Sequence, residues 1–325
     1  MKEETFLSSI NNPLALLLAS LAYSHIFIAR ITKPILRVIS LVPVFYIFTI
    51  LPWYFSSSFL RGLVSFFITW ITSFKLLLFC FKKGPVFDCK NYFDFVLVSI
   101  FPIKFKGTNQ HLDPFLAPKL GFLLPILTYS CIYRDLYEYK PFSGVSIMIL
   151  GFYSLWTCGP GLARVVSRYE LVPLFNHPYL ATSLHDFWGR RWNRLSSSIL
   201  RHTIHDPTKN ALLGIVGVGP AKVVALITTL VVSGIMHELM FYYITCGLTP
   251  SWEMTWFFVL HGLCMAFESI FKYLARARGW SPVHSAISRL LTLGFVLATF
   301  YRLLVLPVLR SAQNDCNLLD KGLRS

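Results

Sequence analysis

One histidine, His237, stands in the otherwise apolar segment VVSGIMHELMF (231–241). Polar side chains inside apolar, membrane-spanning segments are costly and rare, and they usually face a helix-bundle interior or a wet cavity, where they serve chemistry or transport. Burial disfavours a charged imidazolium, so we expect a neutral ring that can accept a proton. A general base needs that property. A histidine that only links helices by hydrogen bonds is the alternative, and position alone favours neither.

Two small residues precede this histidine. Ser233 and Gly234 lie four and three positions before His237, which places them beside its ring if the segment is helical. Small side chains there leave room for a ligand or for a close neighbouring helix. We therefore include Ser233 among the expected substrate contacts. A second histidine in an apolar segment, His261, could line the same cavity, and a structural role fits it equally well.

The block DFWGRRWN (186–193) ends in Asn193, the second candidate for chemistry. A neutral amide both donates and accepts hydrogen bonds, so Asn193 could orient a carbonyl or stabilise an oxyanion without adding charge to a dry site. The alternatives are a helix cap or a surface amide that faces phosphates, and these are commoner roles for a single asparagine.

The other residues of this block suggest binding rather than proton transfer. Planar guanidinium groups can grip phosphates, although contacts with lipid headgroups explain them equally well. An aspartate so close to arginines is expected to pair with one of them. Two tryptophans four residues apart would share one helical face, as packing and interface anchors. These candidates for binding are Arg190, Arg191, Asp186, Trp188 and Trp192, together with Arg194, which directly follows the block.

The composition of the 325 residues indicates a membrane protein. It is 55% hydrophobic and only 14% charged, which is more apolar surface than one water-soluble core could hide. The net charge of +15 puts Lys and Arg in the loops, where they favour an anionic membrane leaflet or an anionic ligand. Because these residues interrupt apolar runs instead of forming one soluble basic face, nucleic-acid binding is excluded. We expect the seven cysteines to be free thiols.

A membrane span needs ~20 apolar residues, and about eight segments approach this length. They lie near 14–31, 37–54, 60–81, 115–132, 142–158, 221–245, 252–271 and 286–308. The sequence therefore predicts an all-α, polytopic transmembrane helical bundle, formed by a single domain over residues 1–325.

The connections between spans alternate in Lys and Arg content, and the positive-inside rule places the rich ones in the cytoplasm and the N-terminus in the lumen. One rich connection, 159–210, carries the DFWGRRWN block and precedes the candidate catalytic helix, 221–245. Its mixture of aromatic residues and arginines suits helices at the headgroup level. Another long connection, 84–113, has an apolar core that is too short and too interrupted to cross the membrane comfortably. We therefore interpret it as interfacial or re-entrant.

Other polar signals are weaker. The spacing of His202 and His205 could hold a metal, but no carboxylate-rich or repeated histidine pattern supports a metal site. HELMF is not HExxH, because Phe241 stands at the last position, and a zinc protease is excluded on that ground. Lys75, in SFKLLLF, is expected either to reach the membrane surface or to have a carboxylate partner.

Taken together, these motifs resemble plant wax synthases of the membrane-bound O-acyltransferase (MBOAT) superfamily. The resemblance rests on SFKLLLF (73–79), PYLATSLHDFWGRRWN (178–193), LRHTIHDP (200–207), VVSGIMHELMF (231–241) and PSWEMTWFFVLHG (250–262), in that order, and it covers essentially the whole chain. It departs at His185, where similar sequences usually carry Gln.

The resemblance implies an MBOAT-like fold and an enzyme of the endoplasmic reticulum membrane that moves a fatty acyl group from acyl-CoA to a hydroxyl. It makes His237 and Asn193 the catalytic pair and a long-chain fatty alcohol the expected acceptor, with no metal or resident cofactor and with membrane lipids around the chain. A sterol or diacylglycerol acceptor is the enzymatic alternative. A multi-span lipid transporter or pseudoenzyme, in which His237 lines a permeation path, is the alternative from another class.

Overall fold

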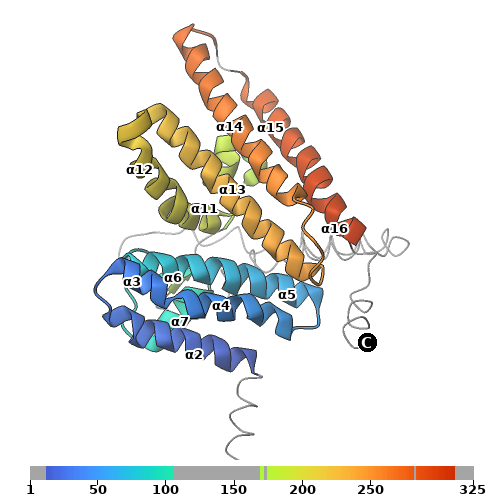
Figure 1. Cartoon of the computed structure of the whole chain (residues 1–325). Coiled ribbons are helices and arrows are strands. Elements are labelled where there is room, and N and C mark those ends of the chain that lie inside the picture. Colours follow the sequence, from blue (N-terminus) through green and yellow to red (C-terminus); the bar gives the residue numbers. More distant parts are fainter. Residues whose placement is uncertain (1–11, 106–168, 172–173, 282, 312–325) are drawn as a thin grey trace, which may run out of the picture.

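A computed structural model of the chain describes residues 12–105, 169–171, 174–281 and 283–311. The first group of helices packs as an N-terminal bundle, and the long helix α13 lies across it (Figure 1). Helices α14 and α15 extend away from that bundle on the far side of α13. The fold is all-α in architecture, as predicted.

The N-terminal bundle consists of seven α-helical or π-helical segments and two short 3-10 turns. They are α2 (Pro13–Ile26), η1 (Ile28–Arg30), α3 (Pro34–Ser40), α4 (Val42–Ile50), η2 (Leu51–Tyr54), α5 (Ser58–Val64), the π-helical η3 (Ser65–Thr72), α6 (Ser73–Cys80) and α7 (Tyr92–Ile100).

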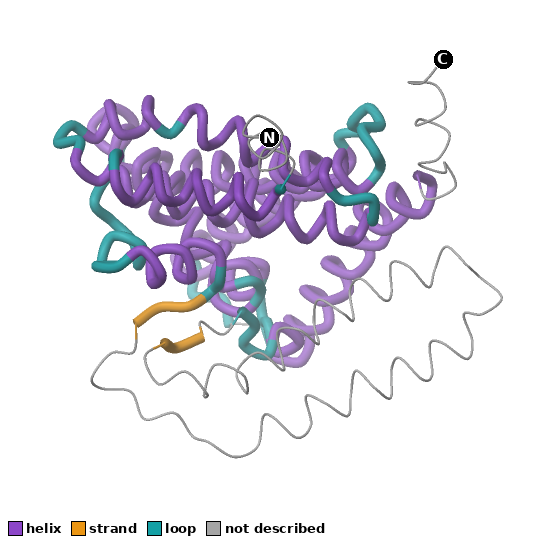
Figure 2. Tube along the Cα trace, turned by 90° about the horizontal axis from the view of Figure 1, so that it is seen from below, coloured by secondary structure: helices purple, strands orange, loops and turns teal. Residues whose placement is uncertain are grey.

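The rest of the described chain begins with short helices and continues with long ones. They are η4 (Pro178–Leu180), α10 (Leu184–Asp186), η5 (Phe187–Arg191), α11 (Arg194–Leu200), η6 (Arg201–His205), α12 (Asp206–Val216), α13 (Val218–Ile244), α14 (Glu253–Ala277), α15 (Ser285–Phe300), η7 (Tyr301–Val305) and α16 (Leu306–Ser311). Three of them, η5, η6 and η7, are π-helical turns. Strands within the described residues form one antiparallel pair, β1 (Ile103–Phe105) with β2 (Tyr169–Leu171), at one edge of the helical body (Figure 2).

Six described helical segments are long and apolar enough to cross a membrane, so the chain is a multi-pass membrane protein. They are Pro13–Arg30, Pro34–Tyr54, Leu60–Cys80, Val218–Ile244, Glu253–Ala277 and Ser285–Val308, and each overlaps a predicted span. The predicted spans 115–132 and 142–158 lie outside the described residues. In the predicted connection 84–113, α7 is nine residues long, too short to cross.

Local sequence signals explain where key helices begin and end. The Asn12 side chain accepts hydrogen bonds from Leu14 N and Ala15 N, and Pro13 occupies the first turn of α2, which is its favoured place. Gly217 separates α12 from α13 with φ +80°, a conformation that side chains rarely adopt. The chain reverses there, so that α12 packs on the start of α13.

The N-terminal bundle buries a core that includes Leu21, Phe48, Leu76 and Phe95. Lys75 lies inside this bundle, 2% exposed, and its Nζ donates hydrogen bonds to Val98 O at 2.7 Å and Phe101 O at 2.6 Å. Both predicted roles for Lys75 are therefore wrong. Its ammonium binds carbonyl groups at the C-terminal end of α7, where a helix has unpaired acceptors.

The prediction of free cysteines is correct for Cys80, Cys89 and Cys264 and wrong for Cys246, which is disulfide-bonded.

The crossing of α13 and α14 positions the candidate base. A Cβ added at Gly234 would lie 2.8 Å from Thr255 Cα, a separation that real Cβ atoms essentially never show, and 3.2 Å from Thr255 O, which is tighter than most real contacts. Only glycine therefore permits this backbone approach, one turn before His237 on the same helix. The expectation that a small residue here serves a neighbouring helix is confirmed.

We expect Gly234→Ala to destabilise the protein by about 1–3 kcal/mol, because the new methyl group forces α13 and α14 apart. Gly219→Ala is the matched control in the same helix, since nothing lies within 4 Å of its added Cβ. That control should be neutral or stabilising by about 0.5–1 kcal/mol through helix propensity. Thermal unfolding of the detergent-solubilised proteins measures both effects. Equal melting temperatures for the two variants would contradict this account of the crossing.

Candidate active site

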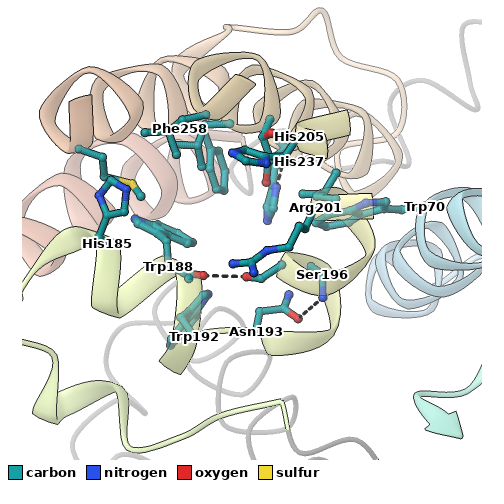
Figure 3. Close-up of a pocket in the computed structure, with 18 residues that line it drawn as sticks. Trp70, His185, Trp188, Trp192, Asn193, Ser196, Arg201, His205, His237 and Phe258 are labelled. Carbon is teal, nitrogen blue, oxygen red and sulfur yellow. Dashed lines mark hydrogen bonds between the residues drawn. The ribbon is translucent and has the colours of Figure 1, made fainter. Parts of the chain in front are cut away.

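Residues from DFWGRRWN (186–193) and VVSGIMHELMF (231–241) meet at one cavity of about 190 Å³ (Figure 3). Helix α13 forms one wall and the DFWGRRWN block with α11 forms another, while Trp70 closes it from the N-terminal bundle. Five of the predicted site residues line it: His237, Asn193, Ser233, Trp188 and Trp192. The fold therefore brings the expected catalytic pair to a common space.

The His237 ring has a defined orientation. Its Nδ1 lies 2.7 Å from Ser233 O, one turn back on α13. A carbonyl oxygen can only accept a hydrogen bond, so in the neutral ring Nδ1 carries the proton and Nε2 carries the lone pair. Phe258 of α14 covers the ring at a centroid distance of 4.4 Å, and the Trp70 ring meets it edge-on at 5.0 Å.

Asn193 serves as the N-cap of α11. Its backbone is left-handed, with φ +38°, and its Oδ1 accepts a hydrogen bond from Ser196 N at 3.2 Å. The helix-cap alternative is therefore correct for the amide oxygen. The amide nitrogen has no hydrogen-bond partner among the described residues, and the residue lines the cavity, so its two N–H donors remain for a ligand.

The block that carries Asn193 is held by its own charged pair. Arg191 Nε lies 2.6 Å from Asp186 Oδ2, which confirms the predicted pairing of Asp186 with one of the arginines. The same guanidinium donates to Asn176 O at 3.3 Å and His177 O at 3.2 Å. This network ties the block to the chain before it.

The two tryptophans do not share a helical face, and that prediction is wrong. The turn from Phe187 to Arg191 is π-helical, and Trp192 leaves it in an extended conformation. The Trp192 ring stacks on Phe187 at 5.4 Å, while Trp188 packs against Phe258 at 5.5 Å. Both rings line the cavity, from different directions.

The arginine that lines the cavity is not one of the three predicted to bind a ligand. Arg190, Arg191 and Arg194 are not among its lining residues, whereas Arg201 is. Figure 3 shows the Arg201 side chain between His237 and Asn193. Helical spacing carries part of this signal, because Arg201, the C-cap residue of α11, lies four residues after Ser197, which also lines the cavity.

His261 lies behind the cavity wall and not on the cavity. It is 0% exposed, its Nδ1 lies 2.8 Å from Phe257 O, and its Nε2 lies 3.4 Å from Thr299 Oγ1. The Trp188 ring meets it at 5.6 Å. The structure corrects its prediction as a substrate contact, because both ring nitrogens face protein groups and other residues separate it from the cavity.

Glu238 does not face His237, as its neighbouring helical position predicted. Its carboxylate accepts hydrogen bonds from Trp252 N at 2.9 Å, Thr255 N at 3.2 Å and Thr255 Oγ1 at 3.4 Å, all at the start of α14. The residue is 3% exposed. A negative charge suits the unpaired N–H groups of a helix N-terminus.

His185 also lines the cavity. Burial lowers the pKa of His185, the Glu268 carboxylate opposes this shift, and Lys272 adds to it. The ring is therefore neutral at physiological pH, which suits it to contact an uncharged ligand.

His202 and His205, whose spacing could hold a metal, both face Asp206. His205 Nδ1 and His202 Nδ1 lie 3.1 Å and 3.5 Å from Asp206 carboxylate oxygens. Burial alone would raise the pKa of Asp206, but the His205 hydrogen bond and the nearby Lys209 charge lower it overall. Among the described residues, no group of three or more His, Cys, Asp or Glu side chains could hold a metal ion.

Comparison with known proteins places this architecture in context. A family model described as "Membrane bound O-acyl transferase family" matches residues 171–260, which include both candidate catalytic residues.

Three relatives in Arabidopsis thaliana match most of the chain. "Probable long-chain-alcohol O-fatty-acyltransferase 9" is 38% identical over 86% of this chain and 84% of its own length. "Probable long-chain-alcohol O-fatty-acyltransferase 6" is 36% identical over 86% of this chain and 83% of its own. "Acyl-CoA–sterol O-acyltransferase 1" is 36% identical over 95% of this chain and 91% of its own.

We expect Arg191→Met to lower the free energy of unfolding by about 1–3 kcal/mol, because it leaves the part-buried Asp186 without its charged partner and two carbonyls without this donor. Arg190→Met, at the exposed neighbouring position, should change it by less than about 0.5 kcal/mol. Thermal unfolding measures the difference, and hydrogen exchange over residues 176–193 locates it. If the two variants are equally stable, the Asp186–Arg191 pair does not hold the block.

Proposed function

The chain belongs to the membrane-bound O-acyltransferase family, and on that premise we propose that it transfers a fatty acyl group from acyl-CoA to the hydroxyl of a long-chain alcohol, forming a wax ester. The observation that carries the proposal is the single cavity lined by His237, with its lone pair at Nε2, and by the free amide nitrogen of Asn193. The relatives whose names describe long-chain-alcohol acyltransferases support the same reaction.

In this mechanism His237 is the general base. Its Nε2 takes the proton from the acceptor hydroxyl as that oxygen attacks the thioester carbon, so a poor nucleophile becomes an effective one. The C–O bond forms, the C–S bond breaks, and the proton passes from the imidazole to the departing CoA thiolate. No acyl-enzyme intermediate is needed.

Asn193 binds the carbonyl oxygen of the thioester. Its amide nitrogen donates a hydrogen bond to the thioester carbonyl, and this bond strengthens as negative charge develops on the oxygen. The Oδ1 bond to Ser196 N fixes the amide plane before the substrate arrives, so the donor needs no reorientation during the reaction.

Acyl-CoA acts as a co-substrate in this proposal, and the reaction needs no metal or resident cofactor. The Arg201 guanidinium, which lines the cavity, binds a phosphate of CoA, as a planar fork does well. This assignment replaces Arg190, Arg191 and Arg194 in that role, because those arginines do not line the cavity.

The acceptor is the point at which the alternatives differ. A sterol acceptor is the second candidate, because a relative named as a sterol O-acyltransferase matches a larger share of this chain than the two alcohol acyltransferases compared above. Diacylglycerol is a further lipidic hydroxyl of the same chemical kind.

We place the enzyme in the endoplasmic reticulum membrane, surrounded by its lipids, with the DFWGRRWN block in the cytoplasm where acyl-CoA is available. The disulfide at Cys246 supports this orientation, because it lies in the connection 246–251, which the charge pattern assigns to the lumen. Disulfides persist in that oxidising compartment.

We expect His237→Asn to lower kcat for ester formation by at least about 100-fold, the usual contribution of general-base catalysis. Asparagine keeps a donor near Nδ1 for the Ser233 carbonyl and has no atom at Nε2, so the change removes the base and little else. Asn193→Ala should also lower kcat, and it removes the α11 cap as well. Labelled acyl-CoA and a panel of fatty alcohols, sterols and diacylglycerols, supplied to microsomes from a host without neutral-lipid synthases, measure the products.

His261→Asn is the matched control, because His261 makes the same bond to the carbonyl four residues back but does not line the cavity. It should keep kcat within about three-fold of the wild-type value while lowering stability. Near-normal ester formation by His237→Asn would disprove the mechanism. Esters of sterols alone would replace the alcohol acceptor with the second candidate.

Arg201→Met tests which cation binds the donor. Loss of one charge-assisted contact should raise the KM for acyl-CoA by about ten-fold and leave the KM for the alcohol unchanged. Arg190→Met should change neither constant. The reverse result would return the donor site to the arginines of the DFWGRRWN block.

A further inference from the structure

We propose that Glu238 is a positioning residue for the catalytic base: its buried carboxylate holds the start of α14 so that the Phe258 ring stays over His237. This inference rests on the proposed role of His237. It concerns a residue that does not itself touch the substrate cavity, since Glu238 is not among the lining residues.

The contacts of Glu238 cross between two helices. The residue belongs to α13, yet all of its hydrogen-bond partners lie at the start of α14: Trp252 N binds one carboxylate oxygen, and Thr255 N and Oγ1 bind the other. A helix cap normally comes from the residue just before the helix. Here a separate helix supplies it, so the cap also fixes the two helices relative to each other.

The charge of Glu238 is balanced by backbone dipoles. No ion-pair partner of Glu238 occurs among the described residues, and the side chain is 3% exposed. Trp252, whose N–H it accepts, has φ +61°, an uncommon conformation for a side chain of this size. A carboxylate that receives three donors can stabilise both the orphan N–H groups and this strained turn.

The link to the base runs along one turn of α14. Phe258 follows Thr255 by three residues, so it lies on the neighbouring part of the same helical face. Its ring is tilted by 36° against the His237 ring at 4.4 Å. Because Gly234 already brings the α14 backbone against α13 at Thr255, a displacement at this point moves Phe258 directly.

The consequence for catalysis is geometric. The Ser233 carbonyl fixes which nitrogen of His237 carries the proton, but it leaves the ring free to tilt about that bond. Phe258 limits the tilt and keeps water away from one ring face. A small misplacement of a catalytic group costs far more in rate than in substrate affinity.

The experiment compares Glu238→Gln with Glu253→Gln in the full-length protein. Glutamine at 238 replaces one acceptor oxygen with an NH2 group that opposes a backbone N–H. Glu253 is the matched control, because it is a carboxylate in the first turn of α14 that pairs with Arg310 and does not approach His237. Measured quantities are kcat, the two KM values, and hydrogen exchange of the peptide covering residues 252–258.

We expect Glu238→Gln to lower kcat by about ten-fold or more, with both KM values within about two-fold, and to speed exchange at 252–258. Glu253→Gln should leave kcat unchanged. Wild-type kcat in Glu238→Gln overturns the proposal. So does an equal change of kcat and of the KM values in both Glu238→Gln and Glu253→Gln, because that pattern reflects general instability.

Phe258→Leu covers the case in which Glu238→Gln fails to accumulate. It keeps the cap and removes the aromatic ring, so a similar fall in kcat supports the proposal and a wild-type kcat overturns it. Failure of the proposed function is recognised separately: the wild type then forms no ester, or His237→Asn remains active. In that event faster exchange at 252–258 in Glu238→Gln, or its absence, still decides whether Glu238 holds α14.

Discussion

The hydrogen bond from His237 Nδ1 to the Ser233 carbonyl is the interaction on which the site depends. A neutral imidazole can carry its proton on either nitrogen, and only one of these forms presents a lone pair to the cavity. The backbone of α13 fixes this tautomer, so no carboxylate is needed beside His237 in the cavity. His261 forms the same bond with Phe257 O, but its Nε2 meets Thr299. What distinguishes the two histidines is therefore the space beyond Nε2.

Two buried charged groups in the spans, Lys75 and Glu238, are bound mainly by backbone groups rather than by opposite charges. Lys75 binds two carbonyls at the end of α7, and Glu238 binds N–H groups at the start of α14. Helix ends present the only unpaired backbone groups inside a membrane, so a buried charge is stabilised there. The same bonds fix how helices cross. Polar residues far from the cavity thus determine the shape of a cavity that they do not line.

Much of this organisation follows from the sequence, because it depends on long-range periodicity and composition. The six described spans coincide with apolar segments, and the small residues beside His237 mark a close helix contact at Gly234. The pairing of Asp186 with an arginine also follows from proximity in the chain. The partner of Lys75 does not, because a carbonyl at the end of another helix has no signature in sequence. For the same reason the adjacent pair His237 and Glu238 shows two polar residues but not that they serve different helices.

The wrong prediction for the two tryptophans of the DFWGRRWN block has a physical origin. Side-chain directions were inferred from 3.6 residues per turn, but the turns Phe187–Arg191 and Arg201–His205 are π-helical, with wider i to i+5 hydrogen bonding. A wider turn rotates each following side chain, so Trp188 and Trp192 separate. Between these turns α11 is regular, and Arg201, which follows it directly, lines the cavity. Nothing in residue type distinguishes a π-turn from an α-turn, so the sequence identifies the block that forms the site without identifying how its side chains face the cavity.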